Sequence, residues 1–204
     1  KALDYIKADG NVIFEIEKHD FGLTLFGRRN GDSDSYYWRV TQWLFPWYTL
    51  IPPFGDHSLV GHVWVPIDDH NMMFWNFVWK RPMPDRVVGQ DGRPLTGVSL
   101  GFEYLPNTTD WLGRWRLTSN PRNDWNIDRE GQANNISYTG ISNILMQDQA
   151  VTESMGPITD HALEHLAPSD LIIARTPPRL LAAARALRDK GQAPPGTQDA
   201  DVYL

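Results

Sequence analysis

Apolar residues alternate with polar ones in a series of short runs that fill the chain from residue 11 to about residue 80. Aromatic and β-branched residues dominate these runs, and clusters of Gly, Asp, Asn and Pro separate them, which is typical of antiparallel strands joined by turns. No helix of normal length fits between the runs, so βαβ units are not expected. The expected strands are NVIFEIEKH (11–19), GLTLFGRR (22–29), SYYWRVTQWLF (35–45), WYTLIPP (47–53), SLVGHVWVPI (58–67) and NMMFWNFVW (71–79).

The next segment, residues 81–135, has a different pattern, in which many Pro, Gly, Asn and Asp residues surround single aromatic ones. A loop of this length inside a compact domain is usually either functional or disordered. Its tryptophans, among them Trp111, Trp115 and Trp125, favour an ordered excursion over the surface or across the mouth of a pocket. One short helix is expected near Thr109–Leu112.

Helical spacing begins near residue 141, in ISNILMQDQAVTESMG, and Gly156-Pro157 closes this helix. A short helical turn is expected at Asp160–Leu166. The amphipathic stretch that follows, SDLIIARTPPRLLAAARALRDKG, begins at a Ser169-Asp170 N-cap and stops at Lys190-Gly191. Proline lacks the backbone N–H that a helix interior needs, so Pro177-Pro178 should divide this stretch into two helices.

A sheet followed by helices predicts an α+β fold, with a long C-terminal helix packed across a curved antiparallel sheet. Such an arrangement can enclose a ligand cavity between the sheet and the helix. At 204 residues the chain fits one domain.

Composition and charge narrow the classes of function. The net charge is −6 and no basic cluster is longer than Arg28-Arg29, which argues against a nucleic-acid binder. No apolar run approaches the ~20 residues of a membrane span, and the N-terminus has no signal-peptide core, so a cytoplasmic protein is expected. Cysteine is absent, so any metal held by this chain must use His, Asp or Glu.

Asp148 stands in the stretch ILMQDQAVTESM, which is otherwise apolar on the faces that must pack. On a helix it shares a face with Ile144, Leu145 and Val151. Burying a lone carboxylate costs several kcal/mol, so the helix must either turn Asp148 to solvent or pair it with a cation or metal. The residue pattern leaves both open, and a solvated Asp148 is the simpler interpretation.

Two stretches, YYWRVTQWLFPWYTLIPPFGDHSLVGHVWVPIDD and TGISNILMQDQAVTESMGPITDHALEHLAPSDLIIAR, resemble the catalytic domain of the Rieske non-haem iron oxygenases, in the group that contains phthalate dioxygenase and the chlorobenzoate and phenoxybenzoate oxygenases. The similarity extends from about Asp20 to Tyr203. It implies a helix-grip fold, like that of the START and Bet v1 proteins. In this family the Asp of the QD pair completes a two-His, one-carboxylate triad that holds mononuclear Fe(II). Asp148 is therefore the expected iron ligand, pointing toward a cavity that admits a metal and a flat ring.

The family's two histidine ligands belong to an Asp-x-x-His-x4-His helix before the strands, and no such motif lies between Lys1 and Phe21. We expect these ligands upstream of Lys1. His57 and His62 match the spacing by count, but they lead into a strand, whose geometry would send the two imidazoles different ways. His161-Ala-Leu-Glu-His165 also has a spacing that can chelate a metal on a helix, although a partly exposed helix with one His bonded to its neighbours is the favoured interpretation.

The resemblance implies hydroxylation or dihydroxylation of a small aromatic acid with Fe(II) and O₂. Electrons would come from NADH through a separate reductase and a [2Fe–2S] Rieske cluster, whose two Cys and two His must lie outside this chain. The family also implies a homo-oligomer, either a trimer or a larger assembly. The alternative is a non-catalytic carrier of hydrophobic ligands with the same fold, because the chain as written lacks two metal ligands.

Three arginines are candidates for holding a substrate carboxylate, since a guanidinium binds carboxylates with two parallel hydrogen bonds. They are Arg28, Arg29 and Arg39. Arg39 alternates with Tyr37, Thr41 and Trp43 on one strand face, so either this face lines a pocket or it is solvated. Gln147 and Glu153 flank Asp148 and are candidate hydrogen-bond partners around the iron ligand, with simple surface exposure as the alternative.

Overall fold

The computed structural model describes residues 2–52, 59–79 and 101–203. The chain divides into two compact units, the first formed by residues 1–82 and 163–204 and the second by residues 83–162. Each unit has a hydrophobic cluster of its own. Within the described residues, no helix combines the length and the apolar character needed to cross a lipid bilayer.

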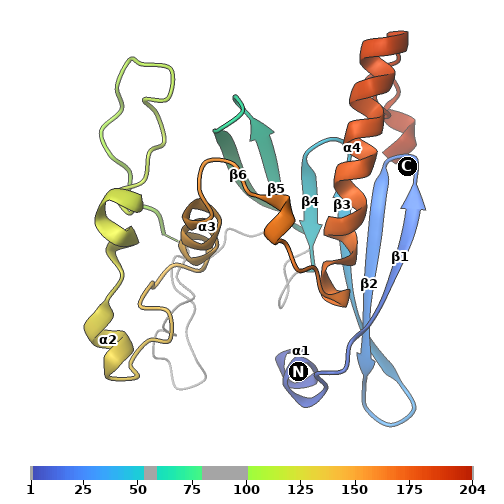
Figure 1. The fold of residues 1–204 in the computed structure, drawn as a ribbon. Helices are drawn as coiled ribbons and strands as arrows, with labels where there is room; N and C mark the ends of the chain where they lie inside the picture. The colour runs from blue at the N-terminus through green and yellow to red at the C-terminus, as the bar shows by residue number, and fades with distance from the viewer. Residues whose placement is uncertain (1, 53–58, 80–100, 204) are drawn as a thin grey trace. The chain divides into compact units, whose positions relative to one another are not determined.

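The first unit is built on a curved antiparallel sheet of six strands that pair in sequence order (Figure 1). The strands are β1 (Ile13–His19), β2 (Gly22–Asn30), β3 (Tyr36–Leu44), β4 (Tyr48–Ile51), β5 (Leu59–Pro66) and β6 (Met72–Trp79). Each corresponds to one of the runs in the alternation pattern, so the predicted sheet is confirmed. A short helix that the pattern did not predict, α1 (Ala2–Ala8), precedes the sheet and stacks its Tyr5 ring on Tyr37 with 5.1 Å between ring centroids.

The register of the six strands fixes which side chains share a face of the sheet. One row of directly paired residues crosses every strand: Lys18, Leu23, Trp43, Thr49, His62 and Asn76. Directly paired residues of an antiparallel sheet point to the same side, and their neighbours along each strand point to the other. We call the side that carries this row the α4 face, because helix α4 packs on its Leu23 and Trp43.

Helix α4 (Leu171–Lys190) confirms the expected helix across the sheet. It packs Ile172, Leu180 and Ala183 against a buried cluster in the sheet. That cluster consists of Leu23, Trp43 and Phe45. The helix ends where expected, at Gly191, whose φ of 65° is left-handed and therefore suits a glycine.

The expected break at Pro177-Pro178 is wrong, because α4 continues through both prolines as one helix. The two prolines remove backbone donors from the helix, but the Thr176 hydroxyl donates to the carbonyl of Ile172 at 2.9 Å in the same turn. Apolar residues before and after the prolines pack on the same buried cluster of the sheet. This shared packing holds the two halves in line, and it outweighs the local preference for a break.

Arg179 joins α4 to the turn between β1 and β2. Its guanidinium donates to the carbonyl oxygens of Gly22 and His19, the latter at 2.8 Å. The same group lies over the rings of Phe45 and Trp43, 5.5 and 6.0 Å from their centroids. Burial lowers the pKa of Arg179 from its ordinary value, and the nearby Asp20 carboxylate opposes that effect. The guanidinium remains charged at neutral pH, since arginine titrates far above it.

The second unit contains η1 (Pro121–Asn126), α2 (Arg129–Ala133) and α3 (Ile144–Ser154). Its buried cluster consists of Ile141, Met146 and Ala150, with Phe102, Leu117, Trp125 and Ile127 packed around it. Of the three tryptophans named in the long segment before α3, Trp125 packs on the cluster, whereas Trp111 and Trp115 are exposed. Residues 80–100 of that segment lie outside the described part.

The helix expected at Thr109–Leu112 is wrong, because this stretch forms a tight turn. The backbone N–H of Thr108 donates to the carbonyl of Gly113 at 2.8 Å, and the N–H of Gly113 donates to that of Asp110 at 3.0 Å. The Thr108 hydroxyl also donates to the Asp110 carboxylate. Short polar side chains compete with the backbone for hydrogen bonds in this way and favour turns over helices.

Short 3₁₀ turns complete the chain: η2 (His161–Leu163), η3 (Pro168–Asp170) and η4 (Ala200–Tyr203). Asp170 occupies the N-cap position of α4 as expected, but its carboxylate accepts from the N–H of Ala167 at 2.8 Å and not from α4. Near the C-terminus the Tyr203 hydroxyl donates to the carbonyl of Phe45 at 3.0 Å. That bond attaches the tail to the sheet.

Arg179→Met should destabilise the protein by about 2–3 kcal/mol, the cost of losing charged hydrogen bonds to two partly buried carbonyls. Methionine keeps much of the apolar stem, so the loss of stability measures the contribution of the guanidinium. Urea unfolding curves measure the change. The matched control is Arg185→Met on the exposed side of α4, for which we expect a much smaller shift. Equal shifts for the two variants would show that Arg179 does not anchor the helix.

Candidate functional site

Helix α3, which carries Asp148, begins and ends where the sequence predicted. The buried side chain of Asn143 caps its start by accepting from the N–H groups of Leu145 and Met146, at 2.8 and 3.1 Å. The Asn143 amide also donates to the carbonyl of Gly101 at 2.6 Å. The cap therefore fixes both the start of α3 and its position against the segment before it.

Asp148 lies on an exposed, apolar stripe of α3. With about 100° of rotation per residue, Asp148 falls among Ile144, Val151 and Met155, on the side away from the buried cluster. The exposed fractions of these three side chains are 41%, 64% and 51%. A single carboxylate surrounded by large apolar side chains is an unusual surface for a solvated helix, whose outer face normally carries several charges.

The Asp148 carboxylate takes part in no hydrogen bond or ion pair within the described part of the chain, although its backbone carbonyl accepts from the Thr152 hydroxyl at 3.0 Å. A hollow of about 520 Å³ lies on the other side of α3, where Asn143 and Met146 line it and Asp148 does not. Among residues 2–52, 59–79 and 101–203, no three His, Asp or Glu side chains lie close enough together to hold a metal. The described residues of the second unit do not form the cavity expected beneath Asp148.

Glu153 and Gln147 make hydrogen bonds elsewhere in the second unit. Glu153 accepts from the indole N–H of Trp125 and from the Gln149 amide, both at 2.7 Å. Gln147 donates to the carbonyl of Ile141 at 3.0 Å. These hydrogen bonds hold α3 against its surroundings, and the expected role of both side chains around an iron ligand stays a prediction.

Trp125 is a residue whose role the sequence did not reveal. It lies in a run of three left-handed residues, Asp124, Trp125 and Asn126, with φ of 50°, 49° and 53°. Such conformations are costly for residues other than glycine, and tertiary contacts must compensate for them. Here the Trp125 ring packs on the cluster under α3, and its N–H bonds Glu153. The contact fixes the rotation of α3 about its axis, and with it the direction of Asp148.

The structure separates the three candidate arginines. Arg28 pairs with Trp38 on the face opposite the α4 face, where its guanidinium lies 4.4 Å from the centroid of the Tyr36 ring. Arg29 pairs with Tyr37 on the α4 face and donates to the carbonyl of Asp9 at 3.1 Å. Arg28 and Arg29 therefore cannot act on one carboxylate from the same side of the sheet.

Arg39 belongs to the α4 face, two residues along β3 from Tyr37 and four from the buried Trp43. One of its guanidinium nitrogens is buried. Helix α4 packs on Trp43 and the ring of Tyr5 stacks on Tyr37 of this strand face. That Arg39 lines a substrate pocket stays a prediction.

His62 also lies on the α4 face, directly opposite Thr49 on one side and Asn76 on the other. Its ring is 4.9 Å from that of Phe74 and 5.8 Å from that of Trp64, centroid to centroid. The alternation of polar and apolar residues was a signal for the face on which His62 lies, since β4, β5 and β6 each place a polar residue in the same row. His57, the other member of the His-x4-His pair, lies outside the described residues.

The helical turn expected at Asp160–Leu166 is shorter than predicted, because η2 ends at Leu163. His161 is in this turn and His165 follows it. The four-residue spacing therefore does not place the two imidazoles on one helix face, and the metal-chelating interpretation of this pair loses its geometric basis.

Comparison with known proteins places the chain in one family. The family model described as "LigXa C-terminal domain like" matches residues 7–203. The oxygenase subunit of 3-chlorobenzoate-3,4-dioxygenase from Comamonas testosteroni is 43% identical over 177 residues, covering 85% of this chain and 41% of the relative. The oxygenase subunit of phthalate 4,5-dioxygenase from Pseudomonas putida is 30% identical over 186 residues, covering 90% and 40% respectively. The chain thus spans about two fifths of the length of these relatives.

Trp125→Phe should keep the ring in its cluster and remove only the N–H that bonds Glu153. We expect a loss of about 1 kcal/mol in unfolding free energy, typical of one hydrogen bond to a charged group at a partly exposed position. Amide hydrogen exchange in α3 should become faster, because the helix loses a fixed contact. Trp111→Phe is the control, since the Trp111 side chain is 82% exposed. Unchanged exchange in α3 would show that this bond does not hold the helix.

Proposed function

The chain belongs to the LigXa C-terminal-domain-like family and is the catalytic domain of a Rieske-type oxygenase, and on this premise we propose that its subunit hydroxylates an aromatic acid with O₂. The observation that carries the proposal is 43% identity, over 85% of this chain, to a subunit named for action on chlorobenzoate. The second relative is named for phthalate, which is also an aromatic carboxylate. These names favour an oxygenase over a non-catalytic carrier of the same fold.

Asp148 is the proposed carboxylate ligand of a mononuclear Fe(II). The QD pair on α3 supports this assignment, and so does the stripe around it, where apolar side chains isolate one oxygen ligand from other charges. Fe(II) held by one carboxylate and two histidines would supply open positions at which O₂ and the ring can meet. The two histidines are expected outside this chain, so Asp148 would be one of the three protein ligands. The Asn143 cap and the bond from Trp125 to Glu153 would hold that ligand in a fixed direction.

The α4 face of the sheet is the proposed wall for the substrate. Arg39 is the arginine best placed to bind a carboxylate there, because it shares this face with the polar row of Thr49, His62 and Asn76. A guanidinium binds a carboxylate strongly where water is excluded, and neighbouring aromatic rings such as Trp64 suit a flat substrate. Arg28 is on the opposite face and fits this role least.

Electron supply and assembly complete the proposal. The chain has no cysteine, so a [2Fe–2S] Rieske cluster would be bound by another part of the subunit, with NADH oxidised by a separate reductase. A homo-oligomer, a trimer or larger, would bring the cluster of one subunit near the iron of another.

Asp148→Ala in the full-length subunit should abolish product formation and remove the mononuclear iron, because two neutral histidines alone hold Fe(II) weakly. The visible absorbance of the Rieske cluster should remain, since its ligands are elsewhere. Metal analysis and the absorbance spectrum measure the two separately. Asp34→Ala, at an exposed position in the first unit, is the control and should keep both the mononuclear iron and the Rieske absorbance. Full iron content with normal turnover in Asp148→Ala would remove Asp148 from the ligand set.

Arg39→Gln should raise KM for an aromatic acid about tenfold or more, as expected for the loss of a charged contact to a carboxylate. Arg28→Gln removes the same charge from the opposite face of the sheet and should leave KM nearly unchanged. Steady-state kinetics are measured with the acid and with its neutral amide. KM for the amide should be similar in the two variants, because the amide has no carboxylate for an arginine to bind. If Arg28→Gln had the larger effect on KM, the α4 face would not be the substrate wall.

A further inference from the structure

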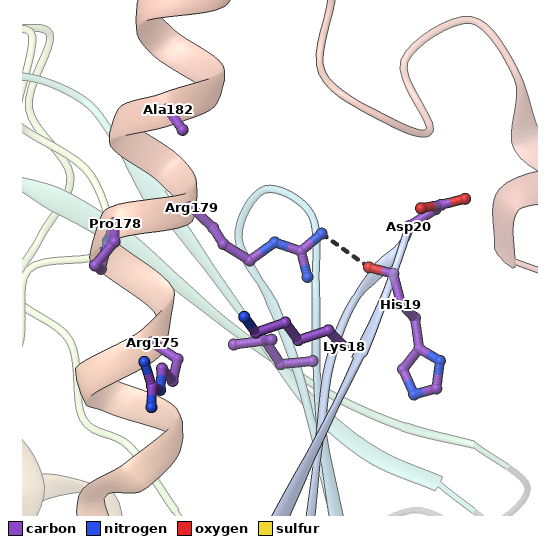
Figure 2. A pocket seen from close by; sticks show the side chains of 8 residues that line it. Lys18, His19, Asp20, Arg175, Pro178, Arg179 and Ala182 are labelled. Carbon is purple, nitrogen blue, oxygen red and sulfur yellow. Dashed lines mark hydrogen bonds between the residues drawn. The ribbon is translucent and has the colours of Figure 1, made fainter.

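A basic hollow of about 460 Å³ opens in the first unit, between α4 and the turn that follows β1 (Figure 2). Its volume is within the roughly 300–1,000 Å³ of sites that bind small molecules. Neither Asp148 nor Arg39 lines it. The hollow therefore contains neither the proposed iron ligand nor the proposed substrate-binding arginine, although its Lys18 and Leu23 belong to the α4 face.

Three cations meet in this hollow. The strand register directs Lys18 of β1 to the α4 face, and Arg175 and Arg179 are one turn apart on α4. Figure 2 shows the Lys18 side chain reaching toward the helix between the two arginines. Asp20 is the one carboxylate among the described lining residues. Like charges one helical turn apart repel each other, so an excess of positive charge at this place favours an anion.

Two of the three cations are available to a ligand. Arg179 already donates to two backbone carbonyls and is held over aromatic rings. Lys18 and Arg175 take part in no hydrogen bond or ion pair within the part of the chain that the structure describes. An ammonium and a guanidinium together can bind both oxygens of one carboxylate.

The other wall of the hollow is apolar. Pro178 and Ala182 of α4 are exposed and stand on the same helix stripe as the arginines, whereas Leu23 beneath them is fully buried and closes the base. Pro178 presents its ring here because α4 continues through the prolines. A fully hydrated anion such as phosphate would not use this surface, whereas a carboxylate with an apolar body would bury part of it.

We propose that this hollow binds a small organic carboxylate, whose anionic end lies between Lys18 and Arg175 and whose apolar body lies on Pro178 and Ala182. The inference goes beyond the proposed oxygenase function and does not depend on iron. Binding here would add a contact between α4 and β1, and so would stabilise the folded state by an amount that grows with the logarithm of ligand concentration above Kd.

The test uses 4-benzoylbenzoate, a photoreactive aromatic carboxylate, with the full-length protein. Binding is measured by equilibrium titration, and irradiation followed by peptide mapping gives its location. We expect attachment near Leu23 or in the peptide that contains residues 178–182. Lys18→Gln with Arg175→Gln should weaken this binding by about tenfold, as for the loss of two partly exposed charge contacts. The neutral 4-benzoylbenzamide should not compete.

The matched control is Arg185→Gln with Lys190→Gln, which removes two positive charges from α4 outside the hollow and should leave binding unchanged. Asp148→Ala should also leave it unchanged, so failure of the iron assignment does not affect the result. Urea midpoints check that the variants fold, and Lys18→Gln alone serves if the double variant does not. Equal weakening in both double variants, or no attachment to the peptides that contain Leu23 or residues 178–182, would overturn the proposal.

Discussion

In an antiparallel sheet each residue is committed to one face by its place in the register, and this constraint decides which side chains of the chain can act together. The row that runs from Lys18 to Asn76 crosses every strand on the face that α4 covers. It sorts Arg39 and His62 onto the covered side and Arg28 onto the other. A slip of one residue in a strand would move that strand's side chains to the other face, so the register is the condition for both proposed binding surfaces.

The helices and strands could be predicted because the hydrophobic patterns that form them act over a few neighbouring residues. Alternation over seven to nine residues identified β1, β2 and β3, and helical spacing closed by Gly156-Pro157 placed α3. The exceptions arise where distant contacts outweigh local preference. Pro177-Pro178 should interrupt a helix, yet packing on the sheet keeps α4 continuous. The left-handed run at Trp125 is tolerated because a residue 28 positions away bonds its indole N–H.

The sequence named one residue of the candidate site, whose role as an iron ligand stays a prediction. The QD pair singled out Asp148, and the exposed apolar stripe around it is what a ligand needs if its partners come from other elements. The roles of the arginines were not predictable, since spacing along a strand cannot say which face another element covers. His62 was missed as a wall residue because its spacing from His57 drew attention to metal binding. The row it shares with Thr49 and Asn76 becomes visible only once the strand register is known.

The position of iron in the full-length subunit tests the central claim most directly. Crystals of the iron-loaded protein, measured on both sides of the iron absorption edge, would locate the metal by anomalous scattering. The account predicts a mononuclear iron bonded to the Asp148 carboxylate on the apolar stripe of α3, with two histidines from outside residues 1–204. A mononuclear iron bonded elsewhere, with the Asp148 side chain in bulk water, would contradict it.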